Sequence, residues 1–372
     1  MKKLAVVVAA ILAATPAFAT NGMRLTGFGA VQGSMGGVGV GASLDSGTVM
    51  SNPAGMADLG GRFDFGATYF SATVETNLPG FGKSTRGATP IPAFGLVLPI
   101  GKDLRFGFGA YGVAGMGVDY TGGHTNFGLM RFAPALSYKL LDILSVGAAV
   151  NVMYANLDFA IFGPGGIVAP GGSGFGFGAT VAAKVTALPI LDIAVAYETK
   201  SDLADFEFNA LFFPPAPPPP YATGPLTVEL DLPPVVTFGV AVKPLPLLLV
   251  AADVQLIQWS STQGTSNMLA PGISPGWKDQ WVYKLGAQVD LLDILKVRAG
   301  FNYGKNPTDP TSPVFVFLPA LSETHISLGA GLALGSNVTV NVGGVISPKV
   351  TVSQAATSTS GYTVEGSVAV TY

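Results

Sequence analysis

The chain has 372 residues, a formal net charge of −3 and 11% charged residues, against about 25% in an ordinary soluble domain. Its weak charge excludes a basic nucleic-acid-binding surface, and its lack of cysteine excludes a disulfide scaffold and thiol chemistry. The mean hydropathy is +0.48, yet beyond the N-terminus no run of about 18 apolar residues could form a membrane helix. A closed β-barrel remains as a way to span lipid, because its strands satisfy one another's backbone groups.

The first residues have the pattern of a secretory signal peptide. Lys2 and Lys3 precede the apolar stretch 4–14, and an Ala-x-Ala cleavage pattern ends at Ala19. An uncleaved anchor is the alternative, but the apolar stretch is too short to span a bilayer. We therefore expect residues 1–19 to be a signal peptide that is removed on export.

The next segment, residues 20–60, is rich in Gly, Ser and Ala and shows little alternation of apolar and polar residues. A barrel of the size expected below encloses a lumen that is either open or filled. We therefore expect residues 20–60 to fold inside the barrel as an N-terminal hatch, or plug.

From residue 61 onward, apolar residues alternate with polar or small ones. The pattern is clear at 144–156, at 295–303 and at the C-terminus, where one face carries Tyr362, Val364, Val368, Val370 and Tyr372. Transmembrane barrel strands of about ten residues need this pattern, apolar towards lipid and polar or small towards the lumen. A soluble β-sandwich would also alternate, but its strands average only about five or six residues.

The connections between strands alternate between short and long, as periplasmic turns and extracellular loops do in outer-membrane barrels. The short ones fall at 99–103, 141–143, 189–191, 244–247, 290–293 and 335–337. The long ones fall at 75–88, 116–126, 163–173, 209–224, 261–278, 305–321 and 351–360. This pattern predicts an all-β fold, a transmembrane antiparallel barrel of about 14 strands over residues 61–372.

Several motifs, in this order, resemble the FadL family of outer-membrane long-chain fatty-acid transporters, whose relatives take up toluene-type aromatics. Near the N-terminus these are Thr26-Gly27-Phe28-Gly29-Ala30, Gly36-Gly37-Val38-Gly39 and Ser51-Asn52-Pro53-Ala54-Gly55-Met56-Ala57. Further along they are Pro134-Ala135-Leu136-Ser137-Tyr138, Tyr154-Ala155, Gly276-Trp277-Lys278-Asp279, Tyr283-Lys284-Leu285-Gly286 and His325-Ile326-Ser327-Leu328-Gly329-Ala330-Gly331. The resemblance covers essentially the whole mature chain.

The resemblance implies a monomeric 14-stranded barrel whose hatch contains Asn52, Pro53 and Ala54. It also implies a route in which ligand lands between extracellular loops, passes to a lumen site and leaves sideways at a kink in the third strand after hatch movement. Physically, an Asn can cap a turn and a Pro fixes its own φ and restrains the preceding residue. An ordinary loop turn is the alternative for these three residues.

Two loops are unusually apolar and are candidates for ligand capture. One contains Phe162 and the other contains Phe212 and Phe213. Exposed apolar patches usually mark interaction sites. The alternative is that these loops pack against each other or against lipopolysaccharide.

The predicted third strand, residues 104–115, is interrupted by Gly107, Gly109 and Gly112. Glycine within a strand marks a bulge, a bend or a close approach of another group. We name these three positions as a candidate lateral opening, with glycines that merely face the plug as the alternative.

Cations inside the lumen could hold a fatty-acid carboxylate through charge-assisted hydrogen bonds. Strand parity turns Arg131, Lys184, Lys284 and Arg298 inward, with Arg131 and Lys284 nearer the extracellular end. The alternative is ion pairing of these side chains with hatch carboxylates such as Asp45 or Asp58.

The family's own ligand-binding cations do not carry over cleanly to this chain. Lys278 lies close to one such position, and Asn156 occupies a position at which a relative has a basic residue. Arg131, Lys284 and Lys278 are therefore the candidate carboxylate ligands, and neutral hydrocarbons stay open as an alternative substrate.

Nothing in the sequence predicts an enzyme, a metal site or a cofactor. His124 and His325 have no metal-ligand spacing, and no Gly-x-Ser-x-Gly motif occurs. We expect an outer-membrane channel for passive uptake of hydrophobic molecules, above all long-chain fatty acids. Uptake of aromatic or other neutral hydrocarbons is the first alternative, and a general diffusion porin would need a more charged lumen. The expected partners are the ligand, membrane lipid with lipopolysaccharide, and the barrel-assembly machinery.

Overall fold

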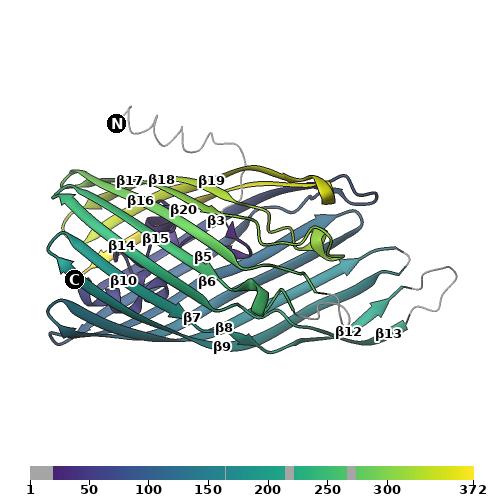
Figure 1. Ribbon diagram of the computed structural model, residues 1–372, viewed down its shortest axis with the longest axis horizontal. Helices are drawn as coiled ribbons and strands as arrows, with labels where there is room; N and C mark the ends of the chain where they lie inside the picture. The colour runs from purple at the N-terminus through teal and green to yellow at the C-terminus, as the bar shows by residue number, and fades with distance from the viewer. Residues whose placement is uncertain (1–19, 164, 214–221, 266–273) are drawn as a thin grey trace.

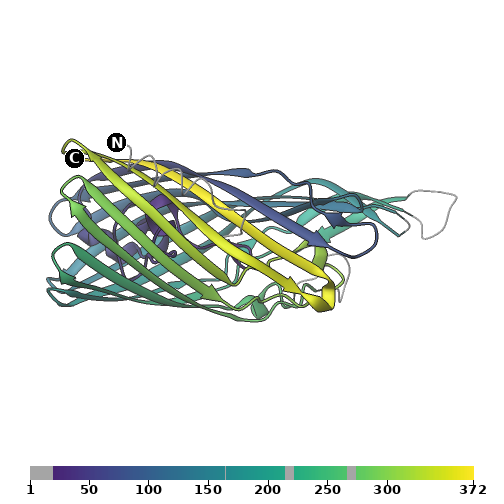
Figure 2. The same cartoon turned by 90° about the horizontal axis from the view of Figure 1, so that it is seen from above.

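The structure is a computed structural model that describes residues 20–163, 165–213, 222–265 and 274–372. The predicted signal peptide lies outside these residues. Fourteen long strands within them form a closed antiparallel barrel (Figures 1 and 2). The ring closes where the last strand pairs with the first, from Arg62↔Thr371 to Thr76↔Thr357. Within the described residues, no helix is long and apolar enough to cross a membrane.

Each barrel strand pairs with its neighbours in chain order. The strands are β3 (Arg62–Thr76), β5 (Thr89–Ile100), β6 (Leu104–Tyr120), β7 (Gly123–Leu141), β8 (Leu144–Ile161), β9 (Ile167–Leu188), β10 (Leu191–Glu198), β14 (Val235–Leu245), β15 (Leu248–Ile257), β16 (Gln280–Leu292), β17 (Leu295–Gly304), β18 (Thr324–Leu334), β19 (Val338–Val352) and β20 (Thr357–Thr371). The predicted number of strands is confirmed. The predicted alternation is confirmed too, since Leu136, Phe177 and Leu328 are exposed on the outer face while their neighbours in sequence face inward.

The six short turns fall where the sequence predicted them, but four of the predicted long loops are wrong in the residues that the structure describes. The segment 116–126 is almost entirely strand, with β6 and β7 separated by two residues. The segments 163–173 and 351–360 likewise lie mostly in strands, the first in β9 and the second in β19 and β20. These strands continue, still paired, into stretches whose sequence lacks the apolar alternation of a membrane strand.

Of the predicted long loop 209–224, the described residues 209–212 and 222–224 belong to the strands of a hairpin that extends from one side of the barrel mouth (Figure 2). It consists of β12 (Phe206–Phe212) and β13 (Ala222–Val228), and β12 also pairs with β9 at Phe212↔Ile167. Smaller elements of the extracellular side are β4 (Gly82–Lys83), β11 (Asp202–Leu203), η2 (Trp259–Ser261), η3 (Phe315–Phe317) and η4 (Ser353–Ala355).

Residues 20–60, called here the N-terminal segment, lie within the barrel, as the purple ribbon of Figure 1 shows. Their elements are short: β1 (Thr20–Asn21), β2 (Arg24–Leu25), α2 (Gly29–Gly33), α3 (Thr48–Ser51) and η1 (Pro53–Asp58). The strands β1 and β2 pair with each other and form an N-terminal hairpin, residues 20–25.

Inward-facing glycines of the wall allow the N-terminal segment to approach very closely. A Cβ added to Gly300 would lie 2.0 Å from the Gly36 nitrogen, and one added to Gly239 would lie 2.2 Å from the Gly41 nitrogen. Because side chains are absent at these points, backbone lies directly on backbone. Part of the high glycine content therefore serves the contact between wall and N-terminal segment.

Candidate ligand path through the barrel wall

The hydrogen-bond ladder between β5 and β6 stops part-way along the two strands, and this gap in the pairing of the wall is called here the wall opening. These strands pair from Ile100↔Leu104 to Ala93↔Tyr111, and beyond that pair no ladder joins them in the described residues. Pro90 and Pro92 stand on β5 where the ladder stops, and a proline has no N–H to donate to a neighbouring strand. The local sequence of β5 therefore explains why its pairing ends there.

Strand β6 is irregular at the same level. Its register with β7 shifts between Gly112 and Ala114, which leaves Val113 as an extra residue on β6. A bulge of this kind bends the strand that carries it. The side chain of Ile91 then lies across Gly112, where an added Cβ would be 2.2 Å from the Ile91 Cγ2.

The N-terminal hairpin meets β6 where β5 has left it. Arg24 pairs with Ala114, and the Gly115 N–H donates to the Met23 carbonyl at 3.0 Å. The hairpin thus supplies hydrogen-bond partners to a strand edge that would otherwise be bare. An unpaired edge is costly away from water, so this contact favours the closed position of the hairpin.

A cavity of about 370 Å³, called here the wall cavity, lies at this opening. Its lining combines Thr20 and Leu25 of the hairpin, inward-facing Phe127 and Leu129 of β7, and Tyr154 of the outer face of β8. The volume is in the range of small-molecule sites, about 300–1,000 Å³. The lining of the cavity therefore includes residues of both the inner and the outer face of the wall.

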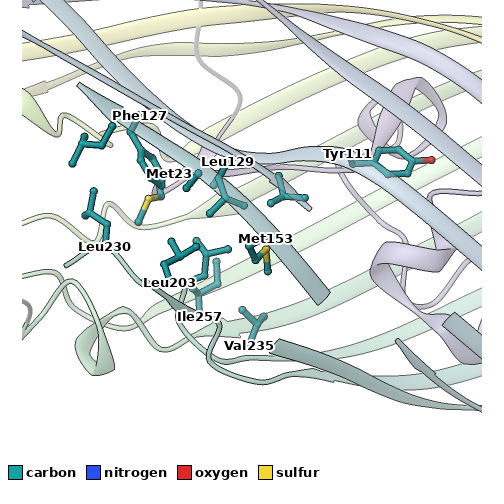
Figure 3. Packing of buried hydrophobic residues seen from close by; sticks show 14 of the residues in the cluster. Met23, Tyr111, Phe127, Leu129, Met153, Leu203, Leu230, Val235 and Ile257 are labelled. Atoms are coloured by element: carbon teal, nitrogen blue, oxygen red, sulfur yellow. The ribbon is translucent and has the colours of Figure 1, made fainter. Parts of the chain in front are cut away.

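An apolar cluster continues from the wall cavity into the lumen (Figure 3). It joins Met23 of the hairpin to Phe127 and Leu129 of β7, Met153 of β8 and Ile257 of β15. From the extracellular side, the segment around η3 adds Val314 and Leu318 to this cluster, while Pro319 and Ala320 line the wall cavity. Apolar side chains therefore extend from the wall cavity into the lumen, which suits a hydrophobic molecule.

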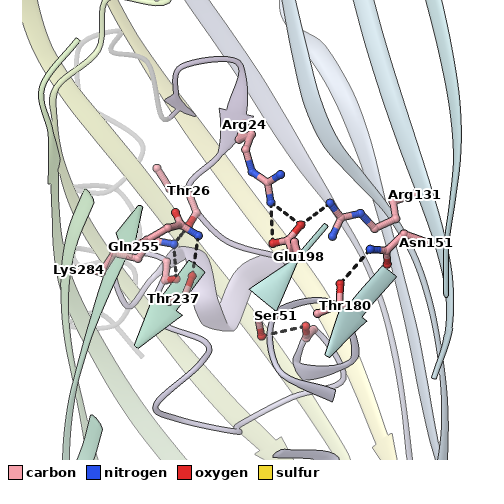
Figure 4. A network of polar contacts seen from close by, with 12 residues as sticks. Arg24, Thr26, Ser51, Arg131, Asn151, Thr180, Glu198, Thr237, Gln255 and Lys284 are labelled. Atoms are coloured by element: carbon pink, nitrogen blue, oxygen red, sulfur yellow. Dashed lines mark hydrogen bonds and ion pairs between the residues drawn. The ribbon is translucent and has the colours of Figure 1, made fainter. Parts of the chain in front are cut away.

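A buried ion cluster holds the hairpin from the lumen (Figure 4). Arg24 Nη2 donates to both carboxylate oxygens of Glu198 at 2.8 Å, and Arg131 Nη2 donates to Glu198 Oε2 at 2.7 Å. Two guanidinium groups therefore share one carboxylate. Arg131 is 1% exposed, and its Nε and Nη1 have no hydrogen-bond partner in the part of the chain that the structure describes.

The rest of the N-terminal segment is fixed by neighbouring charges of the wall. Asp253 accepts hydrogen bonds from three consecutive amides, those of Gly39, Val40 and Gly41, at 2.9, 3.0 and 2.9 Å. Lys284, on the next strand, donates to the carbonyls of Thr26 and Gly37 at 3.2 Å each. Both side chains are thus occupied by the N-terminal segment.

All four predicted inward cations are buried in the lumen, as strand parity predicted. Lys184 forms ion pairs with Asp58 and with Asp192, so the alternative of pairing with a plug carboxylate holds for Lys184. Arg298 donates to the amide oxygens of Gln288 and Asn341.

The six predicted ligand contacts lie outside the lining of the wall cavity. Lys284 lines a separate polar space of about 30 Å³ beside the ion cluster. Lys278 is exposed on an extracellular loop, and Phe162 is 48% exposed. Arg131 belongs to the ion cluster, Phe212 ends β12, and Phe213 follows it.

The glycines of the third strand divide into two groups. Gly107 and Gly109 face the N-terminal segment, where an added Cβ would lie 2.3 Å from the Met56 sulfur and 2.5 Å from the Met50 sulfur. Gly112 alone of the three lines the wall cavity. The alternative of glycines that face the plug therefore describes the first two.

The Asn52-Pro53-Ala54 element ties the N-terminal segment to itself and to the wall. Asn52 is fully buried, its Nδ2 donates to the Val40 carbonyl at 2.8 Å, and its Oδ1 accepts from the Gly55 N–H at 3.2 Å. The Ala54 carbonyl accepts from the Ser137 hydroxyl at 3.1 Å. Asn52 is the N-cap of η1 and Pro53 begins it, an arrangement that suits proline because no N–H is needed there.

Sequence reasoning missed Arg86. This half-buried residue of the connection between β4 and β5 lines the wall cavity, and its Nη2 donates to Asn126 Oδ1 at 2.7 Å. Burial lowers the pKa of the guanidinium, while nearby Asp119 raises it. The signal was present in the sequence as a lone arginine shortly before Thr89-Pro90-Ile91-Pro92, a stretch that cannot pair fully on both sides.

Asp45, in the N-terminal segment, is a buried carboxyl group. Burial and the charge of Asp64 raise its pKa from 3.8 to about 7, against the opposing effect of Arg62. Its Oδ1 has no hydrogen-bond partner among the described residues.

A closed transmembrane barrel with a filled lumen and a cavity that reaches its outer face belongs to the class of outer-membrane transport channels for hydrophobic compounds. The chain belongs to the family of outer membrane protein transport proteins (OMPP1/FadL/TodX), whose model matches residues 6–199 and 197–371. This membership places the protein in the bacterial outer membrane, in a family of transport channels.

Solved structures with the same fold include the Ralstonia pickettii toluene transporter TbuX, with a TM-score of 0.77, 20% identity and coverage of 93% of this chain and 99% of that one. The Pseudomonas putida toluene transporter TodX gives a TM-score of 0.78 at 17% identity, with coverage of 93% and 99%. A Pseudomonas aeruginosa FadL homologue gives 0.80 at 16% identity, with coverage of 94% and 100%. A short stretch of 50 residues is 50% identical to an uncharacterised Chlorobium limicola protein and spans 25% of that protein.

Proposed function

We propose that this protein admits hydrophobic molecules by passive diffusion and releases them sideways through the wall opening. The main support for this proposal is the wall cavity, whose lining includes both the N-terminal hairpin and the outer face of β8. A ligand that reaches this cavity leaves water for an apolar surface and can continue into lipid without crossing a polar barrier.

The N-terminal segment acts as the hatch in this proposal, and the hairpin is the part that moves. Residues 36–41 are held by Asp253, Lys284 and the glycines of the wall, so they form a fixed body. The hairpin is held mainly by one ion cluster and by its short contact with β6. Displacing the hairpin alone would join the wall cavity to the lumen.

Long-chain fatty acids are the substrates we propose first. Arg131 keeps two buried donors without partners among the described residues, and a ligand carboxylate could satisfy them beside Arg24. Aromatic hydrocarbons are the second candidate, because Lys284 is already engaged and two structural relatives are toluene transporters. The exposed side chain of Phe162, with Phe212 and Phe213 on the extracellular hairpin, would capture either ligand first.

Uptake of labelled oleate and of labelled toluene tests this proposal. The full chain is expressed in cells that lack their own transporter of this kind, and surface exposure of the folded barrel is verified. Oleate uptake above background supports the first substrate class, and toluene uptake alone supports the second. A surface-exposed barrel that admits neither compound contradicts the proposed function.

A further inference from the structure

Arg86 stands at the boundary between two cavities. The wall cavity shares Arg86, Gly87, Thr89 and Asn126 with a more open space of about 420 Å³ at the extracellular side. Among the described residues that line the wall cavity, Arg86 is the one with a formal charge. A single charged group in an otherwise apolar site typically fixes the orientation of the ligand.

The guanidinium of Arg86 is available to a ligand. Within the described part of the chain, its one hydrogen bond goes to the Asn126 amide oxygen, and no carboxylate there lies within ion-pair distance of it. It packs on Gly117 of β6, where an added Cβ would be 2.6 Å from the Arg86 Cζ. A half-buried guanidinium with unused donors favours an anionic partner that can accept two parallel hydrogen bonds.

The more open space at the extracellular side of Arg86 is lined by two negatively charged residues. Asp119 and Asp158 line it, with Asp158 bonded to His124 at 3.0 Å and Asp119 accepting from the Thr85 hydroxyl at 3.3 Å. An anion in the wall cavity is therefore attracted to Arg86 and repelled by the two aspartates beyond it. This arrangement holds an anionic head at the boundary and leaves the adjoining wall cavity for an apolar tail.

We propose that Arg86 binds the carboxylate of an amphipathic ligand whose hydrocarbon chain occupies the wall cavity. The proposal rests on the proposed function and adds a specificity-determining residue to it. Arg86 selects for a fatty acid over a neutral molecule of the same length. It also orients the ligand at the opening, tail first towards Leu129 and Met130.

The test compares uptake of labelled oleate with that of labelled oleyl alcohol, which has the same chain and no charge. The variants are Arg86→Gln, Arg86→Lys and, as a matched control from the same extracellular region, Lys83→Gln, whose side chain is exposed. We expect Arg86→Gln to lower oleate uptake at limiting concentration by about tenfold, the effect of one lost hydrogen bond to a charged group. Oleyl alcohol uptake should be unchanged, Arg86→Lys should retain most oleate uptake, and Lys83→Gln should match the wild type.

Oleyl alcohol uptake also reports whether each variant forms a working barrel. An Arg86→Gln barrel that passes both compounds at the wild-type rate overturns the proposal while leaving the proposed function intact. An Arg86→Gln barrel that has lost bound lipopolysaccharide but takes up oleate normally also overturns the proposal. Arg86 would then bind a lipid phosphate and not the ligand carboxylate. A wild-type barrel that admits neither compound overturns the Arg86 proposal, and one that excludes toluene as well contradicts the proposed function.

Discussion

Arg24 of the N-terminal hairpin and Glu198 of β10 form a buried ion pair in which one guanidinium nitrogen lies 2.8 Å from each carboxylate oxygen. The two residues are 174 positions apart in the chain, and Arg131 completes the cluster from β7. This contact joins the part of the structure that we propose moves to a part that does not.

Glu198→Gln should loosen the hairpin while the barrel stays folded. Removing one partner of a buried pair typically costs about 3–5 kcal/mol, because the remaining charges are left uncompensated. The natural reporter is Trp259, whose ring packs on Gly22 of the hairpin, read in a background in which Trp277 and Trp281 are replaced by Phe. Acrylamide should quench Trp259 more strongly in Glu198→Gln than in the exposed control Glu207→Gln. Equal quenching would show that the cluster does not hold the hairpin.

A side chain at Gly300 should displace the fixed body of the hatch. A Cβ there would lie 2.0 Å from the Gly36 nitrogen, a contact that backbone atoms cannot relieve by a small shift. Gly300→Val should therefore raise the leak of small solutes into liposomes that contain the barrel. Gly60→Val is the control, because nothing lies within 4 Å of a Cβ at Gly60. Similar leak from the two variants would contradict the close contact.

Docking of the hatch should weaken as the pH rises through about 7. Burial and Asp64 raise the pKa of Asp45 from 3.8 to about 7, so the docked hatch binds its proton more tightly than the undocked one. The stabilisation is then complete below the ordinary pKa and is lost as the pH rises past the raised value. Hydrogen exchange of amides 46–49, corrected for intrinsic rates, should show this loss in the wild type and not in Asp45→Asn. The same pH dependence in both proteins would assign it to another group.

The barrel was predictable because each strand carries its own local pattern. The alternation at 295–303 and at the C-terminus marks membrane strands without reference to any neighbour. The extracellular ribbons were not predictable in this way, since β12 is stabilised by pairing with β9 and by the packing of Phe206 and Phe208 rather than by an apolar outer face.

The candidate site was harder to predict, since it depends on which segments meet in space. Strand parity placed Arg131 and Lys284 in the lumen, but parity cannot reveal that Glu198 and the carbonyls of the N-terminal segment occupy them. The glycines of the third strand drew attention to β6, whereas the end of the ladder coincides with Pro90 and Pro92 on β5. A proline pair inside a strand was the more specific signal.

A reversible closure of the wall opening tests lateral release most directly. A Cβ at Gly112 would lie 3.6 Å from the Ile91 Cβ, which is within the usual range of about 3.5–4.5 Å for a disulfide. The chain contains no other cysteine, so Ile91→Cys with Gly112→Cys can form a single defined bridge. Uptake of labelled oleate, or of toluene if that is the compound admitted, is measured before and after reduction, with each single variant as a control. We predict that the bridged barrel loses uptake and regains it when reduced. Undiminished uptake by a fully bridged barrel would contradict exit through the wall.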